Sequence, residues 1–173
     1  MTMNRMMLPA ALLLAACSSS QVGAQLAPAA GPAYRAIAFE VRSWGHVIKS
    51  WEVDADGAVR HVKIDGSPFA DHRREHRDFA VDAAAYARLA GLAAELPTPR
   101  PDRDQCKERA TDLPYGTLRL TGAKGEEAVA FDSGCLDARY RAFIDQLLAM
   151  DDLVGGWAAQ QPVDSVEEVG GRR

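Results

Sequence analysis

The chain has 173 residues and a formal net charge of -4, and its composition of 47% hydrophobic, 25% charged and 7% aromatic residues is that of a globular protein. This length suits one domain with a modest hydrophobic core rather than a disordered chain. The acidic balance argues against binding to nucleic acid, which calls for clustered lysine and arginine.

The first 16 residues are typical of a secretory signal peptide. Residues 1–5 carry one positive charge, residues 6–16 are apolar but too short to cross a bilayer as a stable helix, and small residues precede Cys17. The last four positions of this segment, Leu14-Ala15-Ala16-Cys17, resemble the lipobox of bacterial lipoproteins, in which a leucine and two small residues precede a cysteine.

The resemblance implies that the signal is cut before Cys17, that the Cys17 thiol receives a diacylglyceryl thioether, and that the new amino terminus is acylated, palmitate being a typical chain. Two or three chains anchor a protein almost permanently, because each buried methylene contributes about 0.8 kcal/mol. Ser18 stands where lipoproteins kept in the inner membrane often carry aspartate, which favours an outer-membrane anchor facing the periplasm. The alternative is a plain secretory signal cut nearby, with Cys17 incidental.

Residues 17–33 consist mostly of Ser, Gln, Gly, Ala and Pro, which offer almost nothing to bury, and we expect a disordered tether. A single domain is expected over residues 34–154. Alternating apolar side chains predict strands at residues 34–42 and 47–54. The residues predicted to face the core are Ile37, Phe39 and Val41 in the first strand and Val47, Trp51 and Val53 in the second.

Residues 43–46 form a predicted turn in which Trp44 stands beside a glycine. An aromatic side chain at such a turn acts either as an interface anchor or as a lid over the sheet edge. Both interpretations of Trp44 stay open.

Residues 54–57 are predicted to reverse the chain into a third strand at residues 58–64, which completes a meander. The same residues partly match a calcium loop through Asp54, Asp56 and Gly57, but Lys63 stands where the closing glutamate is needed. We therefore interpret the segment as a hairpin turn.

Residues 65–80 are predicted to be a charged loop. His72 and His76 are four positions apart, so a helical turn would place them on one face as candidate metal ligands, with three carboxylates nearby. Three arginines beside them oppose a cation. We therefore favour a solvated loop over a metal site.

A second unit of hairpin and helix follows the first helix. That first helix is predicted after Asp82, a good N-cap, and ends before Pro97, which begins an extended proline-rich loop reaching to Leu113. Strands at residues 115–121 and 126–132 flank a turn at residues 122–125, and a strongly amphipathic helix follows the candidate cap Asp137.

The order βββα and then ββα predicts an α+β two-layer sandwich, in which two helices cover one face of a single antiparallel sheet. The arrangement is similar to small uncharacterised domains of bacterial envelope lipoproteins, in which a hairpin and helix are followed by a second hairpin and helix. This resemblance implies nothing about activity. Residues 155–173 are polar and glycine-rich, and we expect a mostly disordered tail.

Cys106 and Cys135 are the cysteines that remain if Cys17 is lipidated, and an oxidising compartment favours their pairing. The predicted hairpin places them near neighbouring strand ends on one side of the sheet. A disulfide between them closes a ring of about 30 residues and contributes about 3 to 4 kcal/mol in the chain-entropy model. Neither cysteine lies in a C-x-x-C motif, which argues against a redox thiol.

The sequence contains no nucleophile elbow and no motif that implies a cofactor. Our leading hypothesis is a noncatalytic envelope lipoprotein, anchored through Cys17, that binds another envelope protein or a cell-wall component. One alternative is a periplasmic metal-binding protein or hydrolase that uses His72 and His76. Another is an inhibitor that presents the loop around Cys106 to a periplasmic or extracellular hydrolase.

The lipobox yields a direct prediction about the mature amino terminus. We expect mass spectrometry of the membrane-extracted protein to find Cys17 as the first residue, carrying acyl chains. Globomycin, which blocks removal of lipoprotein signals, should leave the uncut precursor. An unmodified Cys17 in the secreted protein contradicts the assignment.

Overall fold

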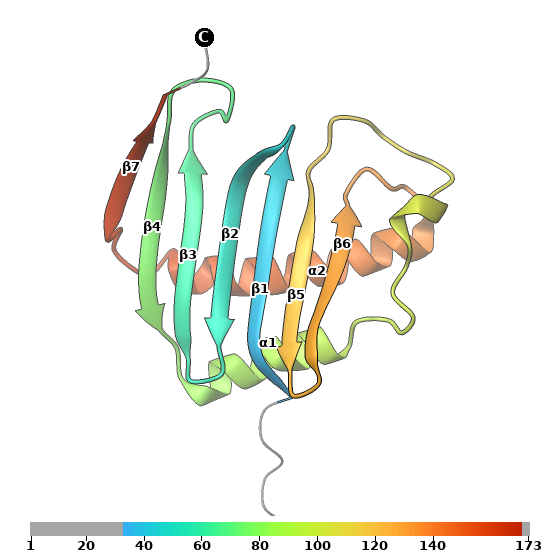
Figure 1. Cartoon of the computed structure of the whole chain (residues 1–173), viewed down its shortest axis with the longest axis horizontal. Helices are drawn as coiled ribbons and strands as arrows, with labels where there is room; N and C mark the ends of the chain where they lie inside the picture. The colour runs from blue at the N-terminus through green and yellow to red at the C-terminus, as the bar shows by residue number, and fades with distance from the viewer. Residues whose placement is uncertain (1–32, 171–173) are drawn as a thin grey trace, which may run out of the picture.

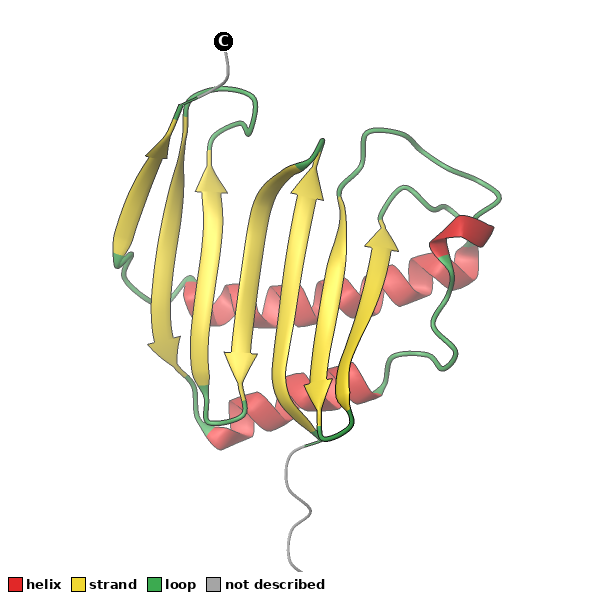
Figure 2. Cartoon of the chain, in the orientation of Figure 1, coloured by secondary structure: helices red, strands yellow, loops and turns green. Residues whose placement is uncertain are grey.

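The computed structural model describes residues 33–170, which form a seven-stranded antiparallel sheet with two helices on one face (Figures 1 and 2). The elements are β1 (Tyr34–Ser43), β2 (His46–Asp54), β3 (Ala58–Asp65), β4 (His72–Ala80), α1 (Ala83–Ala94), the short 3-10 helix η1 (Arg103–Gln105), β5 (Tyr115–Gly122), β6 (Gly125–Asp132), α2 (Ala138–Ala158) and β7 (Ser165–Val169). Across the sheet the strands run β6-β5-β1-β2-β3-β4-β7. The predicted two-layer α+β sandwich is confirmed.

Strand β1 is the middle of the hydrophobic part of the sheet, because it pairs with β2 on one side and β5 on the other. Its alternate side chains Ile37, Phe39 and Val41 are buried, as predicted. The Phe39 ring stacks on Trp51 and on Phe131, with ring centroids 5.4 and 5.0 Å apart. This aromatic row links β2, β1 and β6 across the core.

A bulge at the end of the first hairpin changes which side chain of β2 reaches the core. Val41 pairs with Lys49 but Arg42 pairs with Val47, which leaves Ile48 as the extra residue. Ile48 therefore packs against the core. The prediction that Val47 would do so is wrong, because a one-residue shift in register exchanges the two faces of a strand.

The segment predicted to be a charged loop, residues 65–80, contains strand β4 instead. Its register places Arg73 opposite Asp65, Glu75 opposite Lys63 and Asp78 opposite Arg60. Opposite charges directly across an antiparallel pair each contribute roughly 0.2–1 kcal/mol. The strand is thus stabilised without alternating apolar side chains. Because that alternation is the pattern from which strands are predicted, β4 was missed.

The tail predicted to be disordered, residues 155–173, is ordered as far as the structure describes it. Helix α2 continues to Ala158, and β7 then pairs with β4, which places Glu167 opposite Arg74 and Glu168 opposite Arg73. The Asp164 carboxylate also accepts a hydrogen bond from the backbone N–H of Asp78 at 2.6 Å. The prediction failed because β7 is held by charge pairs with β4. The composition of residues 155–173 gives no sign of this distant partner strand.

The two helices begin differently. The Asp82 carboxylate caps α1 by accepting from the backbone N–H of Ala85 at 2.7 Å, as predicted. Asp137 precedes α2 but its carboxylate makes no cap bond, because it accepts instead from the backbone N–H groups of Lys107 and Glu108. The sequence therefore predicted the position of the N-cap residue correctly in both helices. It predicted a side-chain cap correctly only for Asp82.

A buried carboxylate ties α2 to the sheet. Asp151 of α2 is 4% exposed and accepts hydrogen bonds from Trp51 Nε1, at 3.0 Å, and from Lys49 Nζ. Both donors lie on β2. Because a buried charge without partners is strongly unfavourable, these two bonds define where the helix can rest.

Replacement of Asp151 tests this tie. We expect Asp151→Ala to lower the free energy of unfolding by about 3 kcal/mol, because it leaves a buried indole N–H without an acceptor and Lys49 without its counter-charge. The exposed neighbour is the matched control, and Asp152→Ala should change stability by less than about 0.5 kcal/mol. Urea unfolding at neutral pH measures both. Equal losses in the two variants would contradict the assignment.

Candidate functional site

The predicted disulfide between Cys106 and Cys135 is present, with the Cα atoms 5.8 Å apart. It joins the loop before β5 to the turn after β6. Backbone bonds reinforce the junction, since Ala110 N donates to the Gly134 carbonyl and Leu136 N donates to the Glu108 carbonyl, both at 2.8 Å. Cys17, the predicted lipidation site, lies outside the described residues.

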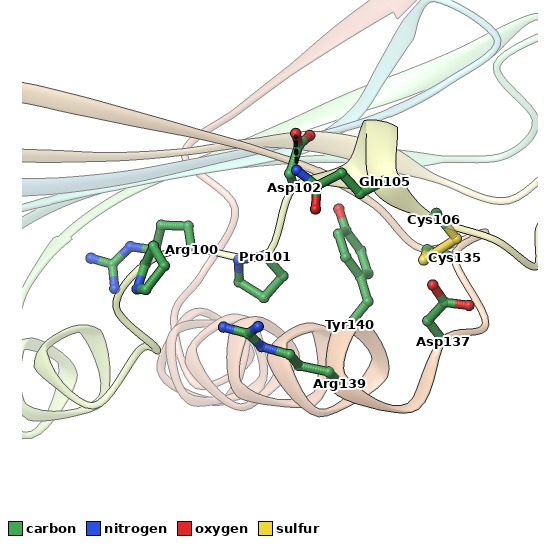
Figure 3. Close-up of a pocket in the computed structure, with 10 residues that line it drawn as sticks. Arg100, Pro101, Asp102, Gln105, Cys106, Cys135, Asp137, Arg139 and Tyr140 are labelled. Carbon is green, nitrogen blue, oxygen red and sulfur yellow. Dashed lines mark hydrogen bonds between the residues drawn. A yellow bond between two sulfur atoms is a disulfide. The ribbon is translucent and has the colours of Figure 1, made fainter.

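A pocket of about 330 Å³ lies beside the disulfide (Figure 3). Among the described residues, five of its six polar side chains have hydrogen-bond partners, and the Arg139 side chain has none. Asp137 accepts from two backbone N–H groups of the loop, Asp102 accepts from Asp104 N and Gln105 Nε2, and the Tyr140 hydroxyl accepts from Asp132 N. Burial raises the pKa of Tyr140, so the phenol stays protonated near neutral pH. We interpret this pocket as the supporting frame of the loop.

A metal ion does not fit this frame. Cys106, Cys135 and Asp137 bring their sulfur and oxygen atoms within 4.8 Å of one another. Both sulfurs are committed to the disulfide, and a metal requires the thiolate form. The cluster is therefore explained by the disulfide itself.

The start of the proline-rich loop is bonded to the rest of the molecule through Arg100. The Arg100 guanidinium donates to the carbonyls of Leu96 and Pro97 and pairs with the Glu127 carboxylate on β6 at 3.0 Å. An inhibitor that presents this loop to a hydrolase would need a segment that is both rigid and protruding. The Arg100 bonds and the disulfide restrain the loop, which agrees with the first of these two requirements.

The candidate metal ligands His72 and His76 do not form one site. Both lie on β4, where four residues span about 13 Å, far more than the roughly 2 Å ligand bonds of one ion allow. The His72 ring contacts the Ala70 carbonyl oxygen at 3.0 Å, and His76 Nε2 lies 3.9 Å from the Glu167 carboxylate. The candidate metal site required a helical turn, and the favoured alternative was a solvated loop. Both are corrected, because residues 72–80 form a strand.

The structure shows a cavity with several charged side chains in its lining that the sequence did not reveal, which we call the His61 pocket. It has a volume of about 190 Å³ and lies between strands β2, β3 and β4 and the end of α2. It is lined by Lys49, His61, Lys63, Glu75, Arg77, Gly155, Ala158 and Ala159. The alternation of Glu75 and Arg77 opposite Lys63 and His61 was a usable signal, but only once β4 is recognised as a strand.

Trp44 is 65% exposed at the turn between β1 and β2, and Phe69, 56% exposed, lies in the loop between β3 and β4. The His46 ring packs edge-on against Phe69 with centroids 5.6 Å apart. We call Trp44, His46 and Phe69 the aromatic tip. The prediction that Trp44 could be an interface anchor is compatible with this exposure, whereas a lid over the sheet edge would be covered.

The turn that carries Trp44 is unusual. Trp44 and Gly45 have φ angles of 49° and 84°, as in the two-residue turn that normally takes Asn-Gly. Two contacts hold it, since Gly45 N donates to the Tyr115 hydroxyl at 3.0 Å and Arg42 donates to the Gly45 carbonyl at 3.2 Å. A large side chain in the left-handed region costs about 1 kcal/mol or more, so the fold maintains this Trp44 conformation against a local preference.

Comparison with protein-family models and with curated proteins finds no match to this chain. Among residues 33–170, no helix is long and apolar enough to cross a membrane.

Stability should depend on pH through His61. Burial, together with Arg77 and Lys49, lowers the pKa of His61 from 6.5 to about 4, while Asp151 opposes the shift. Between these two values the unfolded chain binds a proton that the folded protein does not, so acidification destabilises the fold by up to about 1.4 kcal/mol per pH unit.

Urea unfolding at pH 7, 6 and 5 measures this dependence. The His61→Leu variant should lose less stability between pH 7 and pH 5 than the wild type, because it removes the titrating group. The exposed His46 gives the control, and His46→Gln should retain the wild-type slope. An unchanged slope in His61→Leu would refute the burial of a neutral imidazole.

Proposed function

We propose that this protein is a noncatalytic lipoprotein of the bacterial envelope, anchored through Cys17 in the outer membrane, whose domain binds a partner protein through the aromatic tip. The observation that supports binding is Trp44, an exposed tryptophan held in an unfavourable backbone conformation. Tryptophan is the residue most enriched among those that dominate binding energy at protein interfaces.

The turn is prepared for binding before a partner arrives. Tyr115 from β5 and Arg42 from β1 both hold Gly45, and Arg42 is itself fixed by Glu40 at 2.7 Å. An ordered turn loses little conformational entropy when its side chain enters a pocket. The contacts of Tyr115 and Arg42 with Gly45 therefore favour high affinity, and they also keep the Trp44 side chain in position to meet a partner.

The aromatic tip lies at the end of the sheet opposite to the start of β1 (Figure 1). Strand β1 has ten residues, and the nine steps from Tyr34 to Ser43 span about 30 Å at the usual rise of a strand. The tip thus lies at the end of the domain farther from Tyr34, where an amino-terminal tether would join the sheet. This position would leave the tip accessible to a partner on the periplasmic side.

The chemistry of the tip favours a protein over a cell-wall glycan. Phe69 carries no hydrogen-bonding group, and Leu113, which precedes β5 at the same end of the sheet, is 44% exposed. Apolar side chains of this kind fit an apolar pocket on another protein. The helix-free face of the sheet instead carries ion pairs such as Arg60–Glu52 and Arg42–Glu40.

Photo-crosslinking in living bacteria tests the proposal. A photoreactive phenylalanine analogue replaces Phe69 in the lipidated protein, and the same analogue replaces Lys124 in the distant β5–β6 turn as the matched control. We expect a discrete protein adduct from position 69 that is absent from position 124. Trp44→Asn should reduce the adduct at least tenfold, while the fold is kept because asparagine suits this turn.

Two outcomes would overturn the proposal. Equal adducts from positions 69 and 124, or none from either, would remove the tip as a binding surface. An adduct that sediments with the cell wall and is released by a muramidase would replace the protein partner with a cell-wall partner.

A further inference from the structure

Strand β6 forms one edge of the sheet, and the loop that carries η1 lies beside this edge (Figure 1). A groove of about 410 Å³ runs between them, lined by residues 100–104 of the loop and residues 127–130 of the strand. We call it the β6 groove. Ligand pockets in proteins typically measure about 300–1,000 Å³, so the β6 groove has room for a short stretch of extended chain.

The hydrogen-bond pattern of the β5–β6 hairpin shows which backbone groups of β6 point into this groove. The residues on either side of the two-residue turn, 123–124, form a hydrogen-bonded pair, and such pairs recur at every second residue. Ala128 and Ala130 lie between these positions, so their N–H and C=O groups point away from β5. Asp132 has the same phase, and its N–H indeed donates away from β5, to the Tyr140 hydroxyl at 3.0 Å.

The outward backbone groups of Ala128 and Ala130 have no hydrogen-bond partner among residues 33–170. Both residues are exposed. The loop opposite them cannot act as a regular neighbouring strand, because Pro99 and Pro101 have no N–H to donate. The edge therefore offers two donors and two acceptors, at the spacing of a strand, that the described chain does not use.

This edge also lacks the usual features that prevent strand addition. Natural edge strands are commonly short, charged, bulged or interrupted by proline. The opposite edge, β7, has five residues, of which two are glutamates. Strand β6 has eight residues in unbroken register with β5, contains no lysine or proline, and has the uncharged sequence 128–131 between acidic ends. The two edges are therefore not equivalent, and β6 is the one suited to pairing.

We propose that the β6 groove binds an extended segment of a partner polypeptide, which adds to β6 as an eighth, antiparallel strand. All neighbouring strands of this sheet pair in the antiparallel direction. In this arrangement the two segment residues opposite Ala128 and Ala130 each exchange an N–H and a C=O bond with the strand. The groove is separate from the aromatic tip, and this proposal does not depend on the function proposed for that tip.

The lining of the groove indicates which segments fit. The small side chains of Ala128 and Ala130 lie on the helix-free face, since Val129 and Phe131 between and beyond them are buried on the other face. Segment residues opposite the two alanines can therefore carry bulky β-branched or aromatic side chains. The lining contains one more carboxylate than arginine, so a neutral or basic segment is favoured over an acidic one.

Other occupants match these features less well. A second copy of this chain, paired edge to edge through its own β6, would place its β5 where the loop 100–104 lies, because neighbouring strands are only about 4.8 Å apart. A single extended segment brings no second strand with it. A glycan presents hydroxyl groups without the regular alternation of donor and acceptor that the strand edge offers.

Hydrogen exchange followed by NMR tests the proposal in the mature, disulfide-bonded protein. The probe is an acetylated and amidated pentapeptide with the order lysine, valine, threonine, valine, lysine, whose valines are designed to lie opposite the two alanines. In the free protein the amide hydrogens of Ala128 and Ala130 should exchange quickly and that of Val129, which bonds to β5, slowly. A saturating concentration of the probe should slow exchange at Ala128 and Ala130 at least tenfold.

Matched variants and probes identify the bonds. Ala128→Pro removes an N–H that points into the groove without removing a bond to β5, and should weaken probe binding at least tenfold. Ala128→Ser keeps the N–H and a small side chain, and should bind within twofold of the wild type. A probe that is N-methylated on both valines should not bind, and this arm needs no variant protein. A probe with glutamate in place of both lysines should bind at least threefold more weakly.

Four outcomes would overturn the proposal. The first is an edge already protected from exchange in the free protein at Ala128 and Ala130, and the second is equal binding of the N-methylated and parent probes. The third is equal binding by folded Ala128→Pro and Ala128→Ser. The fourth is a concentration-dependent dimer that sedimentation detects in the wild type but not in Ala128→Pro, which would replace the partner segment with a second copy.

The aromatic tip is tested separately. Ala128→Pro should leave the photo-adduct from position 69 unchanged, and Trp44→Asn should bind the pentapeptide normally. Failure of the β6 groove and failure of the tip are therefore distinguishable.

Discussion

One buried carboxylate fixes how the helical layer lies on the sheet. Asp151 has its two donors, Lys49 and Trp51, on a single strand. A shift of α2 by one turn would move Asp151 by about 5.4 Å and leave it buried without partners. The hydrophobic contacts of α2 are less selective, because similar apolar side chains recur along the helix. We infer that burial provides the stability and that Asp151 selects the register.

This register divides the sheet into an apolar part and a charged part. Large buried side chains of α2, such as Phe143, Leu147 and Met150, precede Asp151, while beyond Val154 the residues of α2 that line the His61 pocket are Gly155 and Ala158. Strands β4 and β7 lie on the charged side and are joined to the sheet by paired charges. The His61 pocket lies at the boundary between these two parts. There the side chains from the helix are small, and most of those from the strands are charged.

Sequence patterns predicted the apolar part of this fold because its information is local. The alternation in β1 and β5, the helical spacing around Tyr140 and the count of cysteines each pointed to the observed structure. Strands β4 and β7 escaped prediction because their stability lies in pairs such as Arg74 and Glu167, which are far apart in the chain. The His61 pocket was missed for the same reason, whereas the unusual setting of Trp44 beside a glycine was visible.

Two features of the domain are local preferences that the fold overrides. At the aromatic tip a bulky residue occupies the backbone conformation that asparagine or glycine prefers, and on β4 the buried Nε of Arg77 has no acceptor in the described chain. Neither feature stabilises the isolated domain. Natural sequences are otherwise locally consistent. At the tip the contacts of Gly45 with Tyr115 and Arg42 hold the unfavourable conformation, and the exposure of Trp44 supports our proposal that the gain is made outside the chain, in a bound partner.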